Sequence, residues 1–182
     1  MRLPTIGRKH PEPGGVSVIE FLHEVSIFED LAPEQLVTLR EMADTQHFRA
    51  GNAIITEGEA GDCMFVLLDG IVDISKSLTL KTSQSEFSTK DKTLTRLKAE
   101  QHPFFGEIAM LGTDVRTATV MAVTDCTTLA FTRGDLETLE RQHPEIAYAV
   151  VKGIAKELCG RLHQQNQNVL KLATALSIAL SR

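Results

Sequence analysis

The chain has 182 residues, of which 42% are hydrophobic and only 5% aromatic, and it contains no tryptophan. This length suits one domain with an additional helix or arm, and its core must be filled mainly by aliphatic side chains. The net charge of −5 argues against a generic nucleic-acid binder, which needs clustered Lys and Arg, but permits binding of one small anion.

The cysteines and histidines give no sign of a metal or redox site. Cys63, Cys126 and Cys159 lie far apart without a CxxC pair, which favours reduced thiols in the cytoplasm. The six histidines show no HxH or HExxH spacing, so no metal is expected. No apolar run reaches the ~18–20 residues of a membrane span, and the N-terminus holds no apolar signal core. We therefore expect a cytoplasmic protein without membrane contact.

The N-terminal part is predicted to form an arm followed by two short helices. Residues 1–16 are rich in Pro and Gly and lack apolar periodicity, which predicts a flexible arm. Apolar residues recur at helical spacing from Val18, and again in LAPEQLVTLREMA, whose Ala-Pro-Glu opening suits a first helical turn. These helices open a globular region that we place at residues 17–143.

Short strands are predicted from His47 to Phe131. Runs rich in Ile, Val and Thr alternate with turns at which glycine recurs. Many short strands with regular turns predict a mainly β fold with flanking helices, an antiparallel β-roll or jelly roll (a double-stranded β-helix). The polar stretch from Ser77 to Thr95 is longer than most hairpin loops, and we interpret it as an extended or floppy exposed hairpin.

Helical periodicity returns after Arg133. GDLETLERQHP predicts a short helix, and residues 144–182 predict one long C-terminal helix that serves as lid and dimerisation element. Its apolar stripe extends beyond what a small roll can cover, so we expect a homodimer. Two alternatives are a helix that folds back on its own domain and a membrane-surface helix, which its low positive charge disfavours.

The stretch FFGEIAMLGTDVRTATV, residues 104–120, carries the most specific chemistry. Gly106 allows close backbone approach, and Glu107 opens a short helical turn whose N–H groups can hold an anion. Arg116 begins a strand-like run and can bind phosphate through two parallel hydrogen bonds, with Thr117 beside it. Glu107 accepts hydrogen bonds from sugar hydroxyls. The pattern predicts a phosphorylated-sugar site, while a simple Glu107–Arg116 ion pair is the structural alternative.

These residues resemble the phosphate-binding cassette of the cyclic nucleotide-binding domain family. Its pattern is F-G-E-[IL]-A-x-[LI]-x…-R-[TSA]-A-T, and the Glu-to-Arg spacing here is that of the regulatory subunits of cyclic-AMP-dependent protein kinase. The resemblance extends to the catabolite activator protein and cyclic nucleotide-gated channels. It covers residues ~18–165, including FRAGNAIITEGEAGDCMFVLLDGIVDI and the helix RGDLETLERQHPEIA.

The resemblance implies a role for several residues of this sequence. Gly106, Glu107, Ile108 and Ala109 would form the short helix under the ribose and the cyclic phosphate, and Phe105 would also be a ligand-binding residue. The phosphate would be bound by Arg116, with Thr117 and Ala118 beside it, and the base would lie against Leu67 and Leu97. By position on the C-terminal helix alone, the cap over the base would come from Leu158, Arg161 and Leu162.

The expected function is a non-enzymatic regulatory module that binds cAMP or cGMP and couples binding to movement of the long helix. We favour cAMP, although Thr at the position of Thr117 accompanies cGMP preference in some family members. A phosphodiesterase would need a metal cluster. Only about 20 residues follow the resembling part, so no DNA binding is expected, and the downstream protein partner is unassigned. The alternatives are a ligand-blind interaction protein of the same fold and a transcription-regulator fragment.

Overall fold

The computed structural model describes residues 17–83, 86–112 and 115–181. The predicted arm, residues 1–16, lies outside this described part. Two short helices come first: α1 (Val18–His23) and α2 (Pro33–Met42). The Ser17 hydroxyl caps α1 by accepting from the Ile19 N–H, and Pro33 stands at the first turn of α2, where no backbone donor is needed.

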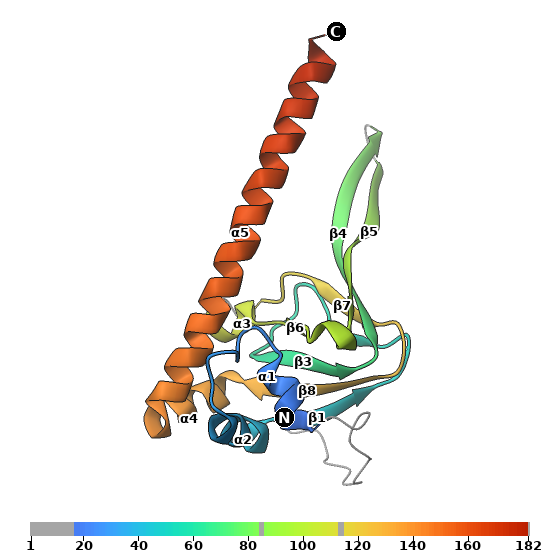
Figure 1. The fold of residues 1–182 in the computed structure, drawn as a ribbon. Helices are drawn as coiled ribbons and strands as arrows, with labels where there is room; N and C mark the ends of the chain where they lie inside the picture. The colour runs from blue at the N-terminus through green and yellow to red at the C-terminus, as the bar shows by residue number, and fades with distance from the viewer. Residues whose placement is uncertain (1–16, 84–85, 113–114, 182) are drawn as a thin grey trace.

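The described residues form eight strands in two antiparallel four-stranded sheets (Figure 1), as predicted for the roll. One sheet has the order β1-β8-β3-β6, with β1 (Asp44–Phe48), β8 (Cys126–Thr132), β3 (Cys63–Asp69) and β6 (Phe104–Phe105). The other has the order β2-β7-β4-β5, with β2 (Ala53–Ile55), β7 (Thr119–Ala122), β4 (Ile71–Ser83) and β5 (Glu86–Lys98). A 3₁₀ turn, η1 (Ala99–Gln101), connects β5 to β6.

Strand β3 is buried on both faces and separates two hydrophobic clusters. Phe65 and Leu67 belong to the cluster between the sheets, whereas Met64, Val66 and Leu68 join the cluster beneath the helices. Because successive strand residues point to opposite faces, a continuous apolar run predicts this double burial. The roll thus has one core inside it and a second core that attaches the helices.

Strands β4 and β5 form a long hairpin. They pair with each other from Ile71↔Lys98 to Ser83↔Glu86, while β7 pairs with β4 only from Val72 to Ser75. Beyond that point the hairpin extends away from the roll as a two-stranded ribbon (Figure 1). The described residues of the polar stretch from Ser77 to Thr95 therefore belong to the two strands of this hairpin, which agrees with the predicted hairpin.

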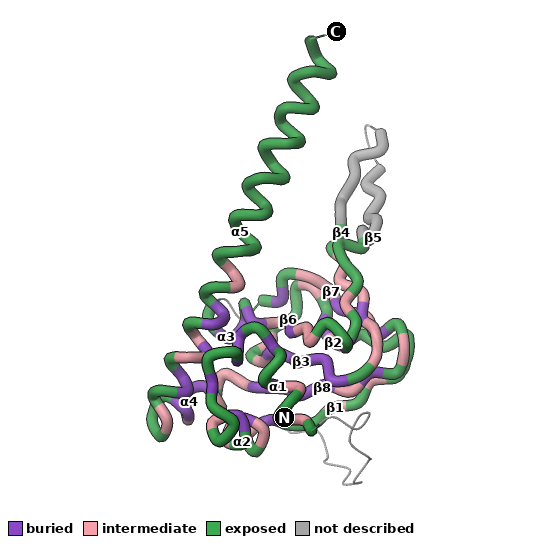
Figure 2. Tube along the Cα trace, viewed as in Figure 1, coloured by how far each residue is buried: buried purple, intermediate pink, exposed green. Residues whose placement is uncertain are grey.

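The remaining helices are α3 (Ile108–Leu111), α4 (Arg133–Gln142) and α5 (Pro144–Leu180), the long C-terminal helix that the sequence predicted. We call residues 144–160 of α5 its anchored half and residues 161–180 its free half. The anchored half packs on the roll, and the free half projects away from it with every residue exposed (Figure 2). Among the described residues, no helix is both long and apolar enough to cross a membrane.

Candidate functional site

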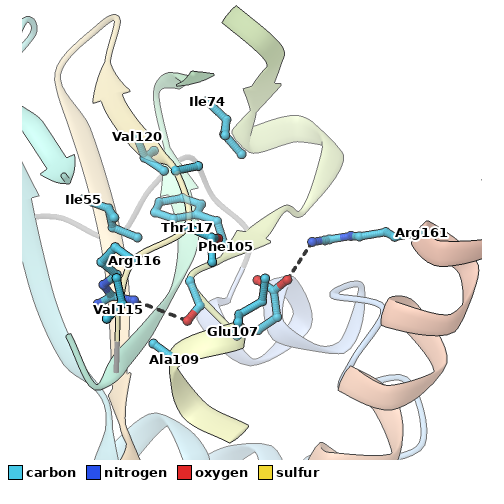
Figure 3. Close-up of a pocket in the computed structure, with 13 residues that line it drawn as sticks. Ile55, Ile74, Phe105, Glu107, Ala109, Val115, Arg116, Thr117, Val120 and Arg161 are labelled. Atoms are coloured by element: carbon cyan, nitrogen blue, oxygen red, sulfur yellow. Dashed lines mark hydrogen bonds and ion pairs between the residues drawn. The ribbon is translucent and has the colours of Figure 1, made fainter. Parts of the chain in front are cut away.

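A pocket opens between the start of α3, the segment before β7 and the middle of α5 (Figure 3). Its charged lining consists of Glu107, Arg116 and Arg161, and Thr117 adds a hydroxyl. Two arginines and one glutamate give this lining a net charge of +1. The electrostatic balance of the pocket therefore favours an anion.

Gly106 and the single turn of α3 build the floor of the pocket. Gly106 has a φ of +84°, which favours glycine, and the four-residue helix α3 begins directly after Glu107. The sequence analysis expected the N–H groups of this turn to be available to an anion. The Ala109 N–H donates here to the Gly106 carbonyl at 3.2 Å. The predicted helical turn is thus present, and its glycine sets the direction of the backbone under the pocket.

Arg116 is buried, with only 8% of its surface exposed. Its Nη1 donates to the Cys63 carbonyl at 2.6 Å and to the Gly106 carbonyl at 3.3 Å, and its Nη2 donates to the Cys63 Sγ at 3.2 Å. Within the described part of the chain, no carboxylate lies within salt-bridge distance of this guanidinium. A buried cation held by neutral groups retains the capacity to bind an anion.

Two glycines make room for the Arg116 side chain. A Cβ at Gly61 would lie 2.3 Å from the Arg116 Nε, and a Cβ at Gly106 would lie 3.0 Å from its Nη1. Any larger residue at Gly61 would displace the guanidinium. These two glycines come from separate loops, so the position of Arg116 depends on tertiary contacts.

Glu107 is also buried, with 3% of its surface exposed, and its charge is balanced from α5. The Arg161 Nη1 donates to the Glu107 Oε1 at 2.8 Å, and the Arg161 Nε donates to the Glu157 Oε1 at 3.0 Å. The Arg161 guanidinium also lies 5.2 Å from the centre of the Phe104 ring. The alternative of a Glu107–Arg116 ion pair is therefore wrong, because the partner of Glu107 is Arg161.

The thiol of Cys63 lies at the inner side of the Arg116 guanidinium. Burial raises the pKa of this thiol, and the charge and hydrogen bond of Arg116 offset part of that rise. The thiol is consequently neutral at physiological pH and acts as a neutral acceptor for Arg116. It adds no negative charge that would compete with a bound anion.

Nine of the thirteen predicted binding or capping residues line this pocket: Phe105, Gly106, Glu107, Ile108, Ala109, Arg116, Thr117, Ala118 and Arg161. The other four lie outside its lining. Leu67 and Leu97 pack in the cluster between the sheets. On α5, Leu158 packs against the helical cluster, and Leu162 is 62% exposed. The predicted cap is thus represented in the pocket by Arg161 alone.

The remaining pocket residues are aliphatic and were not identified from the sequence. Val120 lies opposite Ile55 on β2 and opposite Ile74 on β4, so the three form a row across neighbouring strands. Val115 completes the lining. The sequence marks these residues only as apolar strand positions. Their meeting depends on strand register, which their sequence spacing does not specify.

The described residues hold no group of three or more His, Cys, Asp or Glu side chains that could bind a metal ion. The site is therefore composed of a guanidinium, an ion-paired carboxylate, backbone groups and an aliphatic wall. This combination can bind an organic anion that also carries hydroxyl groups.

Comparison with known proteins identifies the domain type. The profile of the cyclic nucleotide-binding domain matches residues 45–143. The cGMP-dependent protein kinase egl-4 of Caenorhabditis elegans is 32% identical over 134 residues, which cover 69% of this chain and 16% of that kinase. The cAMP-dependent protein kinase regulatory subunit of Dictyostelium discoideum is 32% identical over 106 residues, which cover 57% of this chain and 30% of that protein. The chain thus spans less than a third of either relative.

Solved structures agree with the fold. The N-terminal domain of a transcriptional regulator from Streptomyces coelicolor A3(2) superposes with a TM-score of 0.63 at 26% identity, covering 82% of this chain and 94% of that one. The Thermus thermophilus catabolite activator protein superposes with a TM-score of 0.67 at 25% identity, covering 81% and 63%. With the cassette, the two sheets and the matched profile together, the chain belongs to the cyclic nucleotide-binding domain family.

Proposed function

We propose that this chain is a regulatory module, without catalysis of its own, that binds a cyclic nucleotide in the pocket and transmits binding to α5. The observation that supports this most directly is the buried Arg116, which lines the pocket and whose guanidinium, within the described residues, hydrogen-bonds only to neutral groups. A cyclic phosphate would supply the missing negative charge and accept its charge-assisted hydrogen bonds.

Glu107 and the aliphatic wall suit the rest of such a ligand. The carboxylate of Glu107 can accept a hydrogen bond from a ribose hydroxyl, because within the described part of the chain Arg161 binds only its Oε1. Arg161 also neutralises Glu107, which reduces repulsion between that carboxylate and the phosphate. Ile55, Ile74 and Val120 offer an apolar surface to the sugar and base.

Two contacts connect the pocket floor to the C-terminal helices. At the start of α4, the Arg133 Nη2 donates to the Ala109 carbonyl, and on α5 Arg161 pairs with Glu107. A ligand that shifts α3 would therefore change both contacts. Because linkage is reciprocal, any condition that repositions α5 would also change ligand affinity. We propose this coupling as the regulatory output.

The proposed ligand is cAMP, the nucleotide that the sequence favours. A specific observation supports cGMP as the second candidate: Thr117 lies at the pocket and is exposed, so its hydroxyl is available to a guanine amino group. The relatives named above include both a cGMP-dependent kinase and a cAMP-dependent regulatory subunit. Direct comparison of the two nucleotides distinguishes the candidates.

The proposal also includes association of two copies through α5, a downstream protein partner and a cytoplasmic location. The exposed apolar side chains of the free half support the first. The three free cysteines are compatible with a reducing compartment.

The test is calorimetric titration of the chain with cAMP and with cGMP. We expect binding of at least one, weakened by about 2–3 kcal/mol, roughly 30- to 150-fold, in Arg116→Ala, because a phosphate oxygen is left unpaired. Arg96→Ala is the matched control, since Arg96 is exposed and pairs with Asp73 on the hairpin. Absence of heat and of thermal stabilisation with both nucleotides would favour a ligand-blind interaction protein.

A further inference from the structure

The wall of the pocket continues along strand β4 beyond Ile74. Val72 is buried in the cluster between the sheets, Ile74 lines the pocket, and Lys76 follows at the same spacing of two residues. Side chains alternate between the two faces of a strand, and β4 pairs with β7 without a register shift up to Ser75. Lys76 therefore lies on the pocket face of β4, about 7 Å farther along the strand than Ile74.

A carboxylate stands beside Lys76. The Lys76 Nζ lies 4.0 Å from the Glu57 Oε1, which is beyond the usual length of a hydrogen bond. The Glu57 Oε2 accepts from the Ser77 N–H at 2.9 Å, and this bond holds the carboxylate at the edge of β4. Within the described residues no hydrogen bond involves the Lys76 ammonium, and its side chain is 51% exposed. An available donor and an available acceptor are thus adjacent at this end of the pocket.

This end of the pocket lies away from the residue that would hold the phosphate. Ile74 is on the far side of the pocket from Arg116 (Figure 3). With the phosphate at Arg116 and the ribose at Glu107, the base is the part of a nucleotide that extends to Ile74. The apolar side chain of Ile74 covers the face of the ring in that position. The hydrogen-bonding edge of the base then points toward Lys76 and Glu57.

We propose that Lys76 and Glu57 bind the edge of the nucleobase and favour adenine over guanine. Adenine presents the N7 acceptor beside the N6 amino donor, whereas guanine presents two acceptors, N7 and O6. Lys76 has three donors on a flexible stem and donates to N7 of either base. The Glu57 carboxylate only accepts, so it binds the adenine amino group and repels the guanine O6. An adjacent donor and acceptor therefore match adenine.

This inference rests on the proposed binding of a cyclic nucleotide, and it assigns the choice of base to the β4 side of the pocket. Thr117 gives the opposing contribution, because its hydroxyl is available to a guanine amino group. Specificity is a difference between two affinities. The preference for cAMP over cGMP is then the contribution of Lys76 and Glu57 less that of Thr117.

Calorimetric titration with cAMP and with 7-deaza-cAMP, in which carbon replaces N7, tests Lys76. The wild-type chain should bind 7-deaza-cAMP about 5- to 20-fold more weakly than cAMP, because the ammonium loses its acceptor. Lys76→Met keeps an apolar stem without the charge and should bind the two ligands equally. Lys98→Met is the matched control and should keep the wild-type ratio. Lys98 is exposed and follows Leu97, which packs between the sheets, so it lies on the outer face of the hairpin.

Titration of Glu57→Gln with cAMP and with cGMP tests the acceptor. The amide keeps an oxygen for the Ser77 N–H and presents an NH₂ donor where the carboxylate accepted. The new amide and Lys76 then both donate, which matches N7 and O6 of guanine. The ratio of cGMP affinity to cAMP affinity should therefore rise by about 10- to 100-fold.

The ratios separate contact with the base from a purely structural role of the Lys76–Glu57 pair. A structural defect weakens all nucleotides together and leaves the ratios unchanged. Equal binding of cAMP and 7-deaza-cAMP by the wild-type chain overturns the proposal, as does a cGMP-to-cAMP ratio that Glu57→Gln leaves unchanged. Absence of binding of every nucleotide by the wild-type chain overturns the proposed function itself, whereas cAMP binding without these ratio changes overturns only the assignment of Lys76 and Glu57.

Discussion

The two halves of α5 have the same secondary structure and opposite environments. In the anchored half, Ile146, Val150 and Ile154 are buried in the helical cluster. This half is also held against the connection between α1 and α2, where Lys152 pairs with Asp30 and Lys156 pairs with Glu29. In the free half every residue is exposed, although apolar residues recur there at similar spacing (Figure 2).

This difference shows that periodicity alone specifies a helix with an apolar face but not what covers that face. The roll covers the anchored half, whereas we propose that a second copy of the chain covers the free half. Arg161 lies at the boundary, where it connects α5 to the pocket through Glu107. Matched substitutions in the two halves therefore test whether the buried half contributes more than the exposed half to the free energy of unfolding.

The largest difference is expected between Ile154→Ala and Leu172→Ala. Ile154 is fully buried, so its truncation should lower the free energy of unfolding by about 2–5 kcal/mol. Leu172 is 70% exposed, so its truncation should change that free energy by less than about 0.5 kcal/mol. Urea unfolding at concentrations where the chain is monomeric checks both. Equal losses would mean that the free half packs on the roll.

The two glycines of α5 provide a second pair. A Cβ at Gly153 would lie 2.3 Å from the Ile27 carbonyl oxygen, so Gly153→Ala must push the helix away and should cost about 1–3 kcal/mol. A Cβ at Gly160 meets nothing within 4 Å, so Gly160→Ala should stabilise the helix by about 0.5–1 kcal/mol. The midpoint of thermal unfolding should fall in Gly153→Ala and rise in Gly160→Ala. Shifts of both midpoints in the same direction would contradict the different environments of the two glycines.

The boundary between the halves is tested at Arg161. Arg161→Gln leaves the buried Glu107 carboxylate without its ion-pair partner and should cost about 1–2 kcal/mol of stability. Hydrogen exchange should quicken in the turn around residue 161. Glu157→Gln is the control, because it removes the other partner of Arg161 but keeps Glu107 paired, and exposed pairs contribute little. If both variants lose the same amount of stability, the Arg161–Glu107 contact contributes no more than the exposed Arg161–Glu157 pair.

The smallest effect concerns the ion pairs of the anchored half. The hydrogen bond and charge of Lys152 hold the pKa of the Asp30 carboxyl below its usual range. The unfolded state therefore binds this proton more readily, so the pair adds stability above about pH 4, and that contribution disappears as pH falls through the lowered pKa.

Asp30→Asn should accordingly be slightly less stable than wild type at pH 7, and the two should converge as the pH falls through the lowered pKa of Asp30. Urea unfolding across this pH range measures the difference. Glu41→Gln, which removes an exposed carboxylate of α2 outside these pairs, should show no such convergence. A constant difference between wild type and Asp30→Asn at all pH values would contradict the assignment.

The sequence predicted most of the fold because the signals for it are local. The glycine-punctuated strands, the capped helices and the long helix all follow from neighbouring residues. The family resemblance, carried by the Gly106-to-Ala118 segment, is confirmed. The interpretation of the polar stretch from Ser77 to Thr95 as a hairpin agrees with the pairing of β4 and β5 in its described residues.

The pocket required contacts between distant segments. The wall of Ile55, Ile74 and Val120 depends on the register of three strands. The support of Arg116 by Cys63, 53 residues earlier, depends on the close approach that Gly61 allows. Leu67 and Leu97 were predicted to lie beside the base, but the sheets direct them into the interior cluster.

By itself, the sequence determined the strand and helix pattern, the cassette with its Glu107 and Arg116, and the apolar stripe of α5. Only the tertiary structure decided which charges pair: Arg161 reaches across from α5 to Glu107, while Arg116 turns inward to neutral groups. The physical reason is that backbone preferences act over a few residues, whereas ion pairing and burial depend on which segments the packed sheets and helices bring together.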